Sequence, residues 1–323
     1  MDIYLAVTDY VSNLPVLQHW PEIKEIVARA TTARPKYWEL PLRACEAVGG
    51  ASEQAIPAIA AIGCAQMSIL LIDDMLDDDP RGEYLQVGHA KAANYAAALQ
   101  AAALEAFYAG ETQSRFRLLG LTNLTRMSLM TALGQHLDIQ NPPDEAAYWH
   151  VVETKSAFFF GAALYLGALA GGASSRVARG LERFGHLYGC MIQIHDDLND
   201  VMKTPANSDW LLGRSPLPIL FAQTTDHPAR ARFRELCRDI SKPGALTEAQ
   251  DILIRCGAIS YCVDQLLRRH RVMRKRLASL PLARRDVLDA LTDELVVPVY
   301  RLFRETGIAL PDPLTPDEYL VPA

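Results

Sequence analysis

The stretch EQAIPAIAAIGCAQMSILLIDDMLDDD, residues 53–79, is the most informative part of the chain. Its residues 53–71 are apolar almost throughout and predict a long buried helix, with Pro57 tolerated in the first turn. Five carboxylates then follow within seven residues. Asp73 and Asp77 lie four residues apart, so they share one helix face, where like charges repel. Carboxylates at the end of a buried helix are unfavourable unless a cation compensates them.

A second acidic cluster, MIQIHDDLND at residues 191–200, repeats this arrangement. Asp196 and Asp200 again share a helix face, and Gln193 lies one turn earlier on the same stripe. Carboxylate oxygens select hard cations, and Mg²⁺ prefers one or two carboxylates, several waters and phosphate oxygens. Two facing DDxxD helices are therefore expected to hold magnesium ions that grip a diphosphate. The alternative is a pair of solvated acidic helix ends, which fits poorly with two clusters on otherwise apolar helices.

The rest of the chain is also dominated by helical patterns, and strand-like alternation bounded by hairpin turns is almost absent. Composition marks no internal boundary, so residues 1–323 are expected to form one domain. The predicted fold class is all-α, a single large helical bundle of about ten or more helices around an apolar centre. Helices are expected over residues 91–109, 118–139, 145–171, 176–201, 246–280 and 284–305, with an irregular loop at 203–218 and an irregular proline-rich tail at 308–323.

Composition and charge exclude several functional classes. The 323 residues carry a formal charge of −6, which disfavours nonspecific nucleic-acid binding. Six cysteines form no CxxC pair and no zinc spacing, so they are expected to be free thiols in a reducing compartment, which implies a cytoplasmic protein. The N-terminus shows no secretory signal pattern. Residues 156–175 are uncharged over a length that can span a membrane, but a buried central helix explains them better.

Several basic and polar residues are candidates to face the two acidic clusters. A lone Lys or Arg is usually a solvated surface charge, and this applies to Arg81, Lys203 and Arg214. Lys155 is the exception, because the twenty residues that follow it carry no charge. A Gly-Gln-x-x-Asp segment at residues 134–138 adds polar groups to another apolar helix, where they either hydrogen-bond to a group at the metal or satisfy buried polarity.

Together these residues resemble the trans-isoprenyl diphosphate synthase family, also called the polyprenyl synthetase family, over residues 34–222. Order and spacing both fit, so the resemblance is specific. The matching motifs are Asp73, Asp74 and Asp77 followed by Arg81-Gly82; Gly134-Gln135-x-x-Asp138; Lys155-Ser156 in place of Lys-Thr; Gln193-x-x-Asp196-Asp197-x-x-Asp200; Lys203; and Gly213 to Pro218, with Arg214 replacing a lysine.

The resemblance implies a magnesium-dependent prenyltransferase that condenses an allylic diphosphate with isopentenyl diphosphate to a longer trans-prenyl diphosphate, releasing diphosphate. It also implies an isoprenoid synthase fold with a deep central cavity, about three Mg²⁺ ions per site and a homodimer. By the same resemblance the metal ligands are Asp73, Asp74, Asp77, Asp196, Asp197 and Asp200; the catalytic residues are Arg81, Lys155, Gln193 and Lys203; and the substrate-binding residues are Arg34, Lys36, Arg43, Gln66, Arg81, Lys155, Ser156, Gln193, Lys203 and Arg214.

The departures from the family pattern gather on the isopentenyl side. The family's Gly-Gly-Lys-x-x-Arg-Pro segment is replaced by ARPKYWE at residues 33–39, where Arg34 aligns with the lysine and Tyr37 with the arginine. Lys36 and Arg43 are candidates to compensate. The allylic side is therefore expected to be intact and the isopentenyl side weakened. The other departures are Arg81, which stands alone where the family has two arginines, and Gln66, which stands where many members have histidine.

The expected chemistry is electrostatic, because metals and cations stabilise the departing diphosphate while the C–O bond ionises to an allylic cation. An apolar cavity excludes the water that would quench that cation. Ser68 and Ile69 lie one helical turn deeper than Asp73, where the family often has Phe or Tyr. Without such a floor the product is expected to have roughly twenty carbons or more, unless Phe158 to Phe160 close the pocket.

Two alternative functions are compatible with the sequence. A class I terpene cyclase, or a prenyltransferase with another nucleophile, agrees with the weakened isopentenyl side. However, a second DDxxD stands where cyclases carry an Asn-Ser-Glu triad. A non-catalytic partner subunit of a prenyl synthase would be expected to lose aspartates that this chain keeps. Product analysis with and without isopentenyl diphosphate separates the three.

Overall fold

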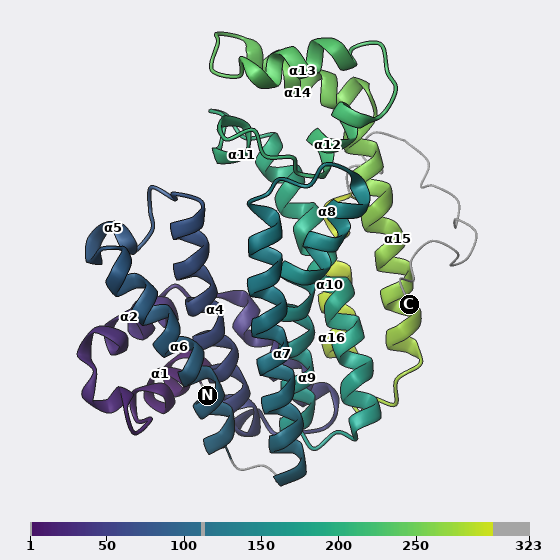
Figure 1. Ribbon diagram of the computed structural model, residues 1–323. Coiled ribbons are helices and arrows are strands. Elements are labelled where there is room, and N and C mark those ends of the chain that lie inside the picture. Colours follow the sequence, from purple (N-terminus) through teal and green to yellow (C-terminus); the bar gives the residue numbers. More distant parts are fainter. Residues whose placement is uncertain (1, 111–113, 300–323) are drawn as a thin grey trace.

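The structure, a computed structural model, describes residues 2–110 and 114–299, and these ranges contain sixteen α-helices and no β-strand (Figure 1). The all-α class predicted from the sequence is therefore confirmed. The α-helices are α1 (Ile3–Ser12), α2 (Pro21–Thr32), α3 (Leu40–Ala47), α4 (Ile56–Leu76), α5 (Tyr84–Val87), α6 (His89–Ala109), α7 (Ser114–Asp138), α8 (Glu145–Val152), α9 (Phe158–Ala170), α10 (Ser175–Val201), α11 (Ser208–Leu211), α12 (Leu217–Thr224), α13 (Arg230–Arg238), α14 (Ala245–Arg255), α15 (Ala258–Ala278) and α16 (Asp286–Glu294). Three turns of 3₁₀-helix, η1 (Leu17–His19), η2 (Lys36–Glu39) and η3 (Ser52–Ala55), and one π-helical turn, η4 (Glu153–Ala157), complete the list.

The centre of the bundle is formed by α4, α9 and α10, and α3, α6 and α7 pack around them (Figure 1). Every residue of α9 from Phe159 to Leu169 is buried. The middle of the uncharged segment 156–175 therefore lies in the core, as predicted, and its apolar character on all sides is what a central helix requires. Close packing depends on small residues, since a Cβ atom on Gly167 would lie 2.1 Å from the carbonyl oxygen of Pro41 in α3.

One helical stretch, Ser52–Leu76, is long and apolar enough to cross a membrane by length and composition alone. This stretch consists of η3 and α4, and it packs against α1, α6 and α9. Of its apolar window, 67% is buried inside the protein, which is the environment of a core helix. Within residues 2–110 and 114–299 no other helix has this length and composition.

A smaller lobe, built from α11 to α14, lies at the end of the bundle that also carries α8 and the end of α10 (Figure 1). It has its own apolar core, in which Trp210 of α11 packs edge-on against Phe233 of α13 at 6.1 Å between ring centroids. The indole N–H of Trp210 donates to the carbonyl oxygen of Val201 at 3.1 Å. This hydrogen bond ties the lobe to the last turn of α10.

Several predicted segments differ from the observed helices. Residues 145–171 are not one helix but α8 and α9 joined by the π-helical turn η4. Residues 246–280 are divided at Gly257, whose φ of 86° is a left-handed conformation that favours glycine. The loop at 203–218 contains the short helix α11. The tail at 308–323 lies outside the described residues, so both its irregularity and the single domain over 1–323 stay predictions, as does the deep central cavity.

Candidate active site

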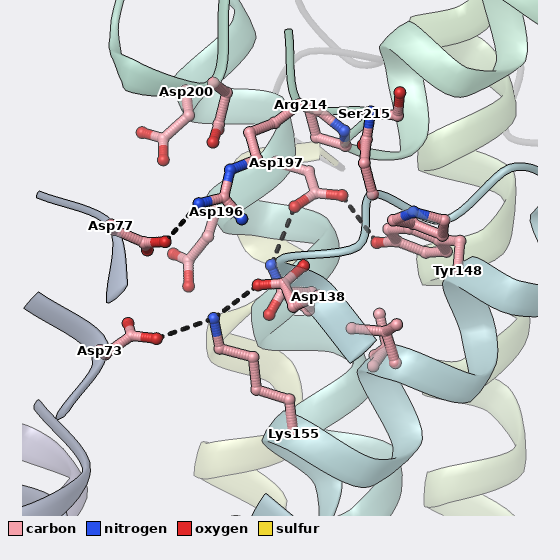
Figure 2. A pocket seen from close by; sticks show the side chains of 17 residues that line it. Asp73, Asp77, Asp138, Tyr148, Lys155, Asp196, Asp197, Asp200, Arg214 and Ser215 are labelled. Carbon is pink, nitrogen blue, oxygen red and sulfur yellow. Dashed lines mark hydrogen bonds and ion pairs between the residues drawn. The ribbon is translucent and has the colours of Figure 1, made fainter. Parts of the chain in front are cut away.

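Both acidic clusters lie near the C-terminal ends of their helices, where the helix dipole is negative. Asp73 is in the last turn of α4 and Asp77 caps it, while Asp196 and Asp200 lie in the last two turns of α10. Carboxylates are disfavoured at this end of a helix, so each cluster requires compensating cations. The two clusters meet at one pocket of about 320 Å³ (Figure 2). Its charged lining is seven carboxylates against two cations: Asp73, Asp77, Asp138, Asp196, Asp197, Asp200 and Asp209 against Lys155 and Arg214.

The α4 cluster is paired with two cations that come from distant parts of the chain. Asp73 Oδ1 lies 3.0 Å from Lys155 Nζ, and it also accepts a hydrogen bond from Gln135 Nε2 at 3.3 Å. Asp77 Oδ1 lies 2.5 Å from an Nη atom of Arg214, in the loop that follows α11. Burial raises the pKa of Asp77, and the nearby Asp73 charge adds to this. Both carboxylates therefore have a counter-ion supplied by the chain itself.

Lys155 is the residue that joins the largest number of charged groups in the pocket. Its Nζ atom lies 2.7 Å from Asp138 Oδ2 as well as 3.0 Å from Asp73. Burial lowers the pKa of Lys155, but Asp73 and Asp138 raise it by a larger amount. The net shift is therefore upward, and the side chain is charged. The π-helical turn η4 carries this lysine, and π-helical turns are frequent at functional sites. Lys155 is thus placed to bind an anion once its partners are neutralised.

Gly134 in α7 fixes the position of Lys155, because a Cβ atom there would lie 2.3 Å from the backbone nitrogen of Lys155 and 2.5 Å from its Cα. We expect Gly134→Ala to push η4 away from α7, with a loss of about 1–3 kcal/mol of stability and a clear loss of turnover. Urea denaturation and steady-state rates measure the two effects. Gly180→Ala is the matched control, since its Cβ would meet only the movable tip of Leu280. Normal turnover in Gly134→Ala would contradict the inference that Gly134 fixes the position of a functional Lys155.

Among the described residues, one cation forms an ion pair with the α10 cluster. Burial raises the pKa of Asp196 to about 6, and the neighbouring Asp200 charge adds to this. Asp200 Oδ1 lies 2.5 Å from Lys203 Nζ, an exposed residue after the helix. No ion pair involving Asp196 is found within the described residues. Asp196 is therefore the carboxylate in this cluster with the most to gain from a bound metal ion.

Asp197 is used differently, because its oxygens are already occupied by groups of the protein. Oδ2 accepts hydrogen bonds from the Tyr148 hydroxyl at 2.7 Å and from the backbone N–H of Leu217 at 2.8 Å. Oδ1 accepts one from Gln193 Nε2 at 2.9 Å, and Gln193 Oε1 in turn accepts from Ser156 Oγ at 2.9 Å. Asp197 thereby links α8, α10 and α12, while its role as a metal ligand stays a prediction.

Two predicted residues of the first cluster do not line the pocket. Asp74 lies beside Gly82, and burial raises its pKa to about 6, with the nearby Asp79 and Asp73 charges adding to this. Arg81 is exposed over 87% of its side chain and pairs with Asp79 Oδ2 at 2.9 Å. The structure therefore does not bring Arg81 together with Lys155 and Arg214.

The basic residues predicted to bind the second diphosphate are all paired with carboxylates outside the two acidic clusters. Arg34 lies 2.7 Å from Asp2 and Lys36 lies 2.7 Å from Glu294, while Arg43 lies 3.1 Å from Glu39. None of them lines the pocket. Of the two remaining residues on this side, Tyr37 packs edge-on against Phe160 at 4.9 Å, and Gln66 accepts a hydrogen bond from the indole N–H of Trp38 at 2.6 Å.

Several pocket residues carry no assignment from the sequence, and the polar ones among them are Asn141, Tyr148 and Asp209. Asn141 has a φ of 57° and donates from Nδ2 to the carbonyl oxygen of Gly213 at 3.0 Å. Burial raises the pKa of Asp209, and the nearby Asp200 charge adds to this. Asn141 precedes two prolines, a pattern that marks the end of a helix and not a site. Tyr148 lies within α8 and Asp209 within the short helix α11, and neither belongs to a motif that marks a site.

The pocket has the donor chemistry that magnesium requires, although it is not a ready-made metal site. Within the described ranges no three His, Cys, Asp or Glu side chains lie close enough together to hold an ion by themselves. The carboxylates instead face one another across the pocket from α4 and α10 (Figure 2). Magnesium is usually bound by one or two carboxylates together with waters and substrate phosphates. Asp73, Asp77, Asp196 and Asp200 fit that pattern, with a diphosphate supplying the missing oxygens.

Comparison with known proteins agrees with this geometry. A family model described as polyprenyl synthetase matches residues 23–253, more than two thirds of the chain. The chain belongs to the polyprenyl synthetase family. The short chain isoprenyl diphosphate synthase of Methanothermobacter thermautotrophicus is 30% identical to this family member over 79% of the chain and 82% of the relative. The geranylgeranyl diphosphate synthase of Methanosarcina mazei is 30% identical over 55% of the chain, and the match covers only 60% of that relative.

Solved structures resemble this polyprenyl synthetase along nearly its whole length. The geranylgeranyl pyrophosphate synthetase of Pyrococcus horikoshii superposes with a TM-score of 0.80 at 22% identity, over 92% of the chain and 95% of that structure. The decaprenyl diphosphate synthase of Rhodobacter capsulatus superposes with a TM-score of 0.79 at the same identity, over 92% and 95%. These likenesses establish the fold of the polyprenyl synthetase described here.

Proposed function

We propose that this polyprenyl synthetase is a Mg²⁺-dependent prenyltransferase that condenses an allylic diphosphate with isopentenyl diphosphate to a longer trans-prenyl diphosphate. The supporting observation is that DDxxD clusters from α4 and α10 line one pocket together with Lys155 and Arg214. Asp73, Asp77, Asp196 and Asp200 would hold about three ions between them. Bound Mg²⁺ supplies Lewis-acid stabilisation of the diphosphate that leaves the allylic carbon.

The ion pairs of the pocket suggest how the allylic diphosphate is captured. Lys155 and Arg214 are paired with Asp73 and Asp77, which are the carboxylates expected to bind metal. When those carboxylates are neutralised by cations, Arg214 loses its partner and Lys155 keeps only Asp138, so both side chains become able to bind phosphate oxygens. The pocket thus exchanges its own counter-ions for metal ions and turns its lysine and arginine toward the substrate. Both residues then stabilise the charge that develops on the leaving group.

The length of the product depends on the residues below Asp73 on α4. Ser68 is buried and its hydroxyl donates to the carbonyl oxygen of Ala96 in α6 at 2.8 Å, so it faces α6. Ile69 lies four residues before Asp73 and shares its helix face. No aromatic side chain therefore lies directly below the metal cluster on α4. A product of roughly twenty carbons or more agrees with this small floor and with the geranylgeranyl diphosphate synthases among the relatives.

The acceptor side favours a second candidate function. Metal binding cannot release Arg34, Lys36 and Arg43, because their partners Asp2, Glu294 and Glu39 lie outside the acidic clusters. An acceptor diphosphate would have to break these pairs itself, which weakens its binding. A terpene cyclase, or transfer to an acceptor without a diphosphate, has no such requirement. Chain elongation stays the first proposal because relatives named prenyl diphosphate synthases match this chain over most of its length.

Product analysis separates the two candidates. The purified protein is incubated with Mg²⁺ and farnesyl diphosphate, with and without isopentenyl diphosphate, and the products are identified by mass spectrometry. A longer diphosphate formed only when isopentenyl diphosphate is present supports chain elongation. A hydrocarbon or alcohol formed equally well without it supports the cyclase and overturns the first proposal. Absence of turnover with geranyl, farnesyl and geranylgeranyl diphosphate would instead support a non-catalytic partner subunit.

A homodimer is proposed from the outer faces of two neighbouring helices. On α7 the exposed positions repeat with alternating spacings of three and four residues, which is the pattern of a helix seam. This face carries apolar and small side chains together with one histidine. The α6 face beside it presents Ala97, Ala101 and the exposed Tyr108. The α7 stripe consists of Leu118, Thr122, Thr125, Leu129, Ala132 and His136.

Leu129→Glu tests the dimer, because Leu129 is 68% exposed at the middle of the stripe. In a two-fold interface the variant places two carboxylates against apolar surface. We therefore expect the dissociation constant of the dimer to rise about a hundredfold or more. Size-exclusion chromatography with light scattering measures the mass. Leu5→Glu, at a 70% exposed position on α1, is the matched control and should leave the mass unchanged. A monomeric wild-type protein, or a dimeric Leu129→Glu variant, would refute the interface.

Cytoplasmic location belongs to the same proposal. The six cysteines are free thiols, and those at 45, 64, 190 and 262 are buried. Burial raises the pKa of the Cys64 thiol to about 12, which makes it unreactive. Unreactive free thiols agree with a reducing compartment.

A further inference from the structure

A second groove, separate from the catalytic pocket, lies on the small lobe between α11 and α13. It has a volume of about 570 Å³ and is lined by residues of α11, the turn that follows it, α12 and α13. One wall is apolar, because Leu211 and Leu212 are each 57% exposed and Ile240 closes the floor. Two adjacent exposed leucines give this wall an apolar surface that can hold a hydrocarbon chain.

The opposite wall of this groove is cationic. Arg234 and Arg238 line it, and no carboxylate does. Arg234 donates from Nε and one Nη to the carbonyl oxygen of Gln223, at 3.1 and 2.5 Å. Arg238 donates from Nε to the carbonyl oxygen of Arg234 at 3.3 Å. Backbone oxygens therefore orient both guanidinium groups while leaving N–H donors available, and neither arginine forms an ion pair among the described residues.

The groove and the catalytic pocket share one thin wall. Asp209 faces the pocket, the next four residues line the groove, and Arg214 faces the pocket again. The turn is closed by a hydrogen bond from the Arg214 backbone N–H to the Asp209 carbonyl oxygen at 2.8 Å. Gly213, with a φ of 67°, reverses the chain within it, and its carbonyl oxygen is held by Asn141 of the pocket at 3.0 Å. A ligand pressing on Leu212 and Gly213 would therefore move Arg214 relative to Asp77.

We infer that this groove binds an amphiphilic anion, namely a prenyl phosphate ester, and that its occupation regulates the catalytic pocket through the turn carrying Arg214. The hydrocarbon chain lies along Leu211, Leu212 and Ile240, and the phosphate binds Arg234 and Arg238. Charge complementarity supports this occupant, because a chain of net charge −6 presents two arginines and no acid at an apolar groove. The choice of a prenyl ester rests on the proposed function, since the product would have this chemistry. Bound product is expected to inhibit the enzyme.

Binding is tested with geranylgeranyl monophosphate in the presence of EDTA, where metal-dependent capture at the catalytic pocket is suppressed. Isothermal titration calorimetry on the full chain should give one saturable site. The double variant Arg234→Gln/Arg238→Gln should weaken binding about tenfold or more, whereas Asp73→Asn/Asp196→Asn should leave it unchanged. Arg230→Gln is the matched control, because this exposed α13 arginine pairs with Asp226 outside the groove. Inorganic diphosphate alone and geranylgeraniol alone should each bind at least about tenfold more weakly than the ester.

Inhibition provides the second test. Geranylgeranyl monophosphate should inhibit wild-type and Arg230→Gln enzyme without competing with the allylic substrate, and it should not inhibit Leu211→Ser/Leu212→Ser. The exposed leucine pair keeps the test valid if the arginine variant fails to fold, which circular dichroism shows. Binding that survives loss of both arginines, disappears with Asp73→Asn/Asp196→Asn, or never saturates would overturn the inference. The titration in EDTA needs no turnover. An inactive enzyme that still binds the ester would therefore contradict the proposed function and support the groove as a binding site.

Discussion

Replacing Asp73 by Asn should lower kcat/KM for the allylic diphosphate by roughly three orders of magnitude. The variant loses a carboxylate that is expected to hold metal, and it also loses the partner that lies 3.0 Å from Lys155 Nζ. Asn keeps the size of the side chain and its hydrogen bond to Gln135, so the fold should persist. Steady-state kinetics over a range of Mg²⁺ concentrations should show a higher Mg²⁺ requirement together with the lower rate.

The same acidic run supplies the control for this experiment. Asp78 lies five residues after Asp73, is exposed and does not line the pocket. Its φ of 50° is a conformation that Asn tolerates well. Asp78→Asn should therefore retain wild-type turnover and Mg²⁺ dependence. If both variants were equally impaired, a general loss of negative charge would explain the effect. This result would contradict the assignment of Asp73 as a metal ligand.

Replacing Lys155 by Gln should lower kcat by roughly two to three orders of magnitude, since it removes a partly buried cation that lines the pocket expected to hold the leaving diphosphate. A second effect should run in the opposite direction. Lys155 lies within 3.0 Å of Asp73 and 2.7 Å of Asp138, so in the absence of substrate it competes with metal for these carboxylates. The variant should consequently bind Mg²⁺ more tightly than the wild type does before substrate is added. Calorimetric titration of the substrate-free protein with Mg²⁺ measures this.

The predicted fall in kcat together with the predicted rise in Mg²⁺ affinity distinguishes a direct role of Lys155 from a structural one. A variant that was merely misfolded would lose both turnover and metal affinity. Lys203→Gln is the comparison, because Lys203, although predicted from sequence to be catalytic, is exposed, pairs with Asp200 and does not line the pocket. Its effect on kcat should be about tenfold or less. Unchanged Mg²⁺ affinity in Lys155→Gln would argue against the exchange of counter-ions proposed above.

The site residues that were predicted from the sequence are mainly those that recur at helical spacing. Asp73 and Asp77, and Asp196 and Asp200, recur at a spacing of four on apolar helices, and the structure places all four around one pocket. Lys155 was recognised because charge is absent from the twenty residues after it. In each case the signal is local, since one helix fixes which side chains share a face.

Long-range pairing could not be predicted in this way. Arg214 reaches Asp77 from 137 positions away, and Asn141 holds the carbonyl oxygen of Gly213 from 72 positions away. Arg81 follows the first cluster directly, yet its nearest acid is Asp79, and the side chain turns to solvent. The helix α11 has only four residues, too few to show a period. The helix α13 was missed although its buried residues Phe233 and Leu236 lie at helical spacing.

The dual pairing of the aspartates on α4 has a consequence for how the enzyme tolerates scarcity of magnesium. A pocket that depended wholly on divalent ions would be left with bare repelling charges whenever those ions were scarce. Here Lys155 and Arg214 pair with Asp73 and Asp77, so these two aspartates have counter-ions even without magnesium. Treatment with a chelator should stop turnover, while the melting temperature stays close to that of the protein with magnesium bound. Addition of magnesium should then restore the full rate without a refolding step.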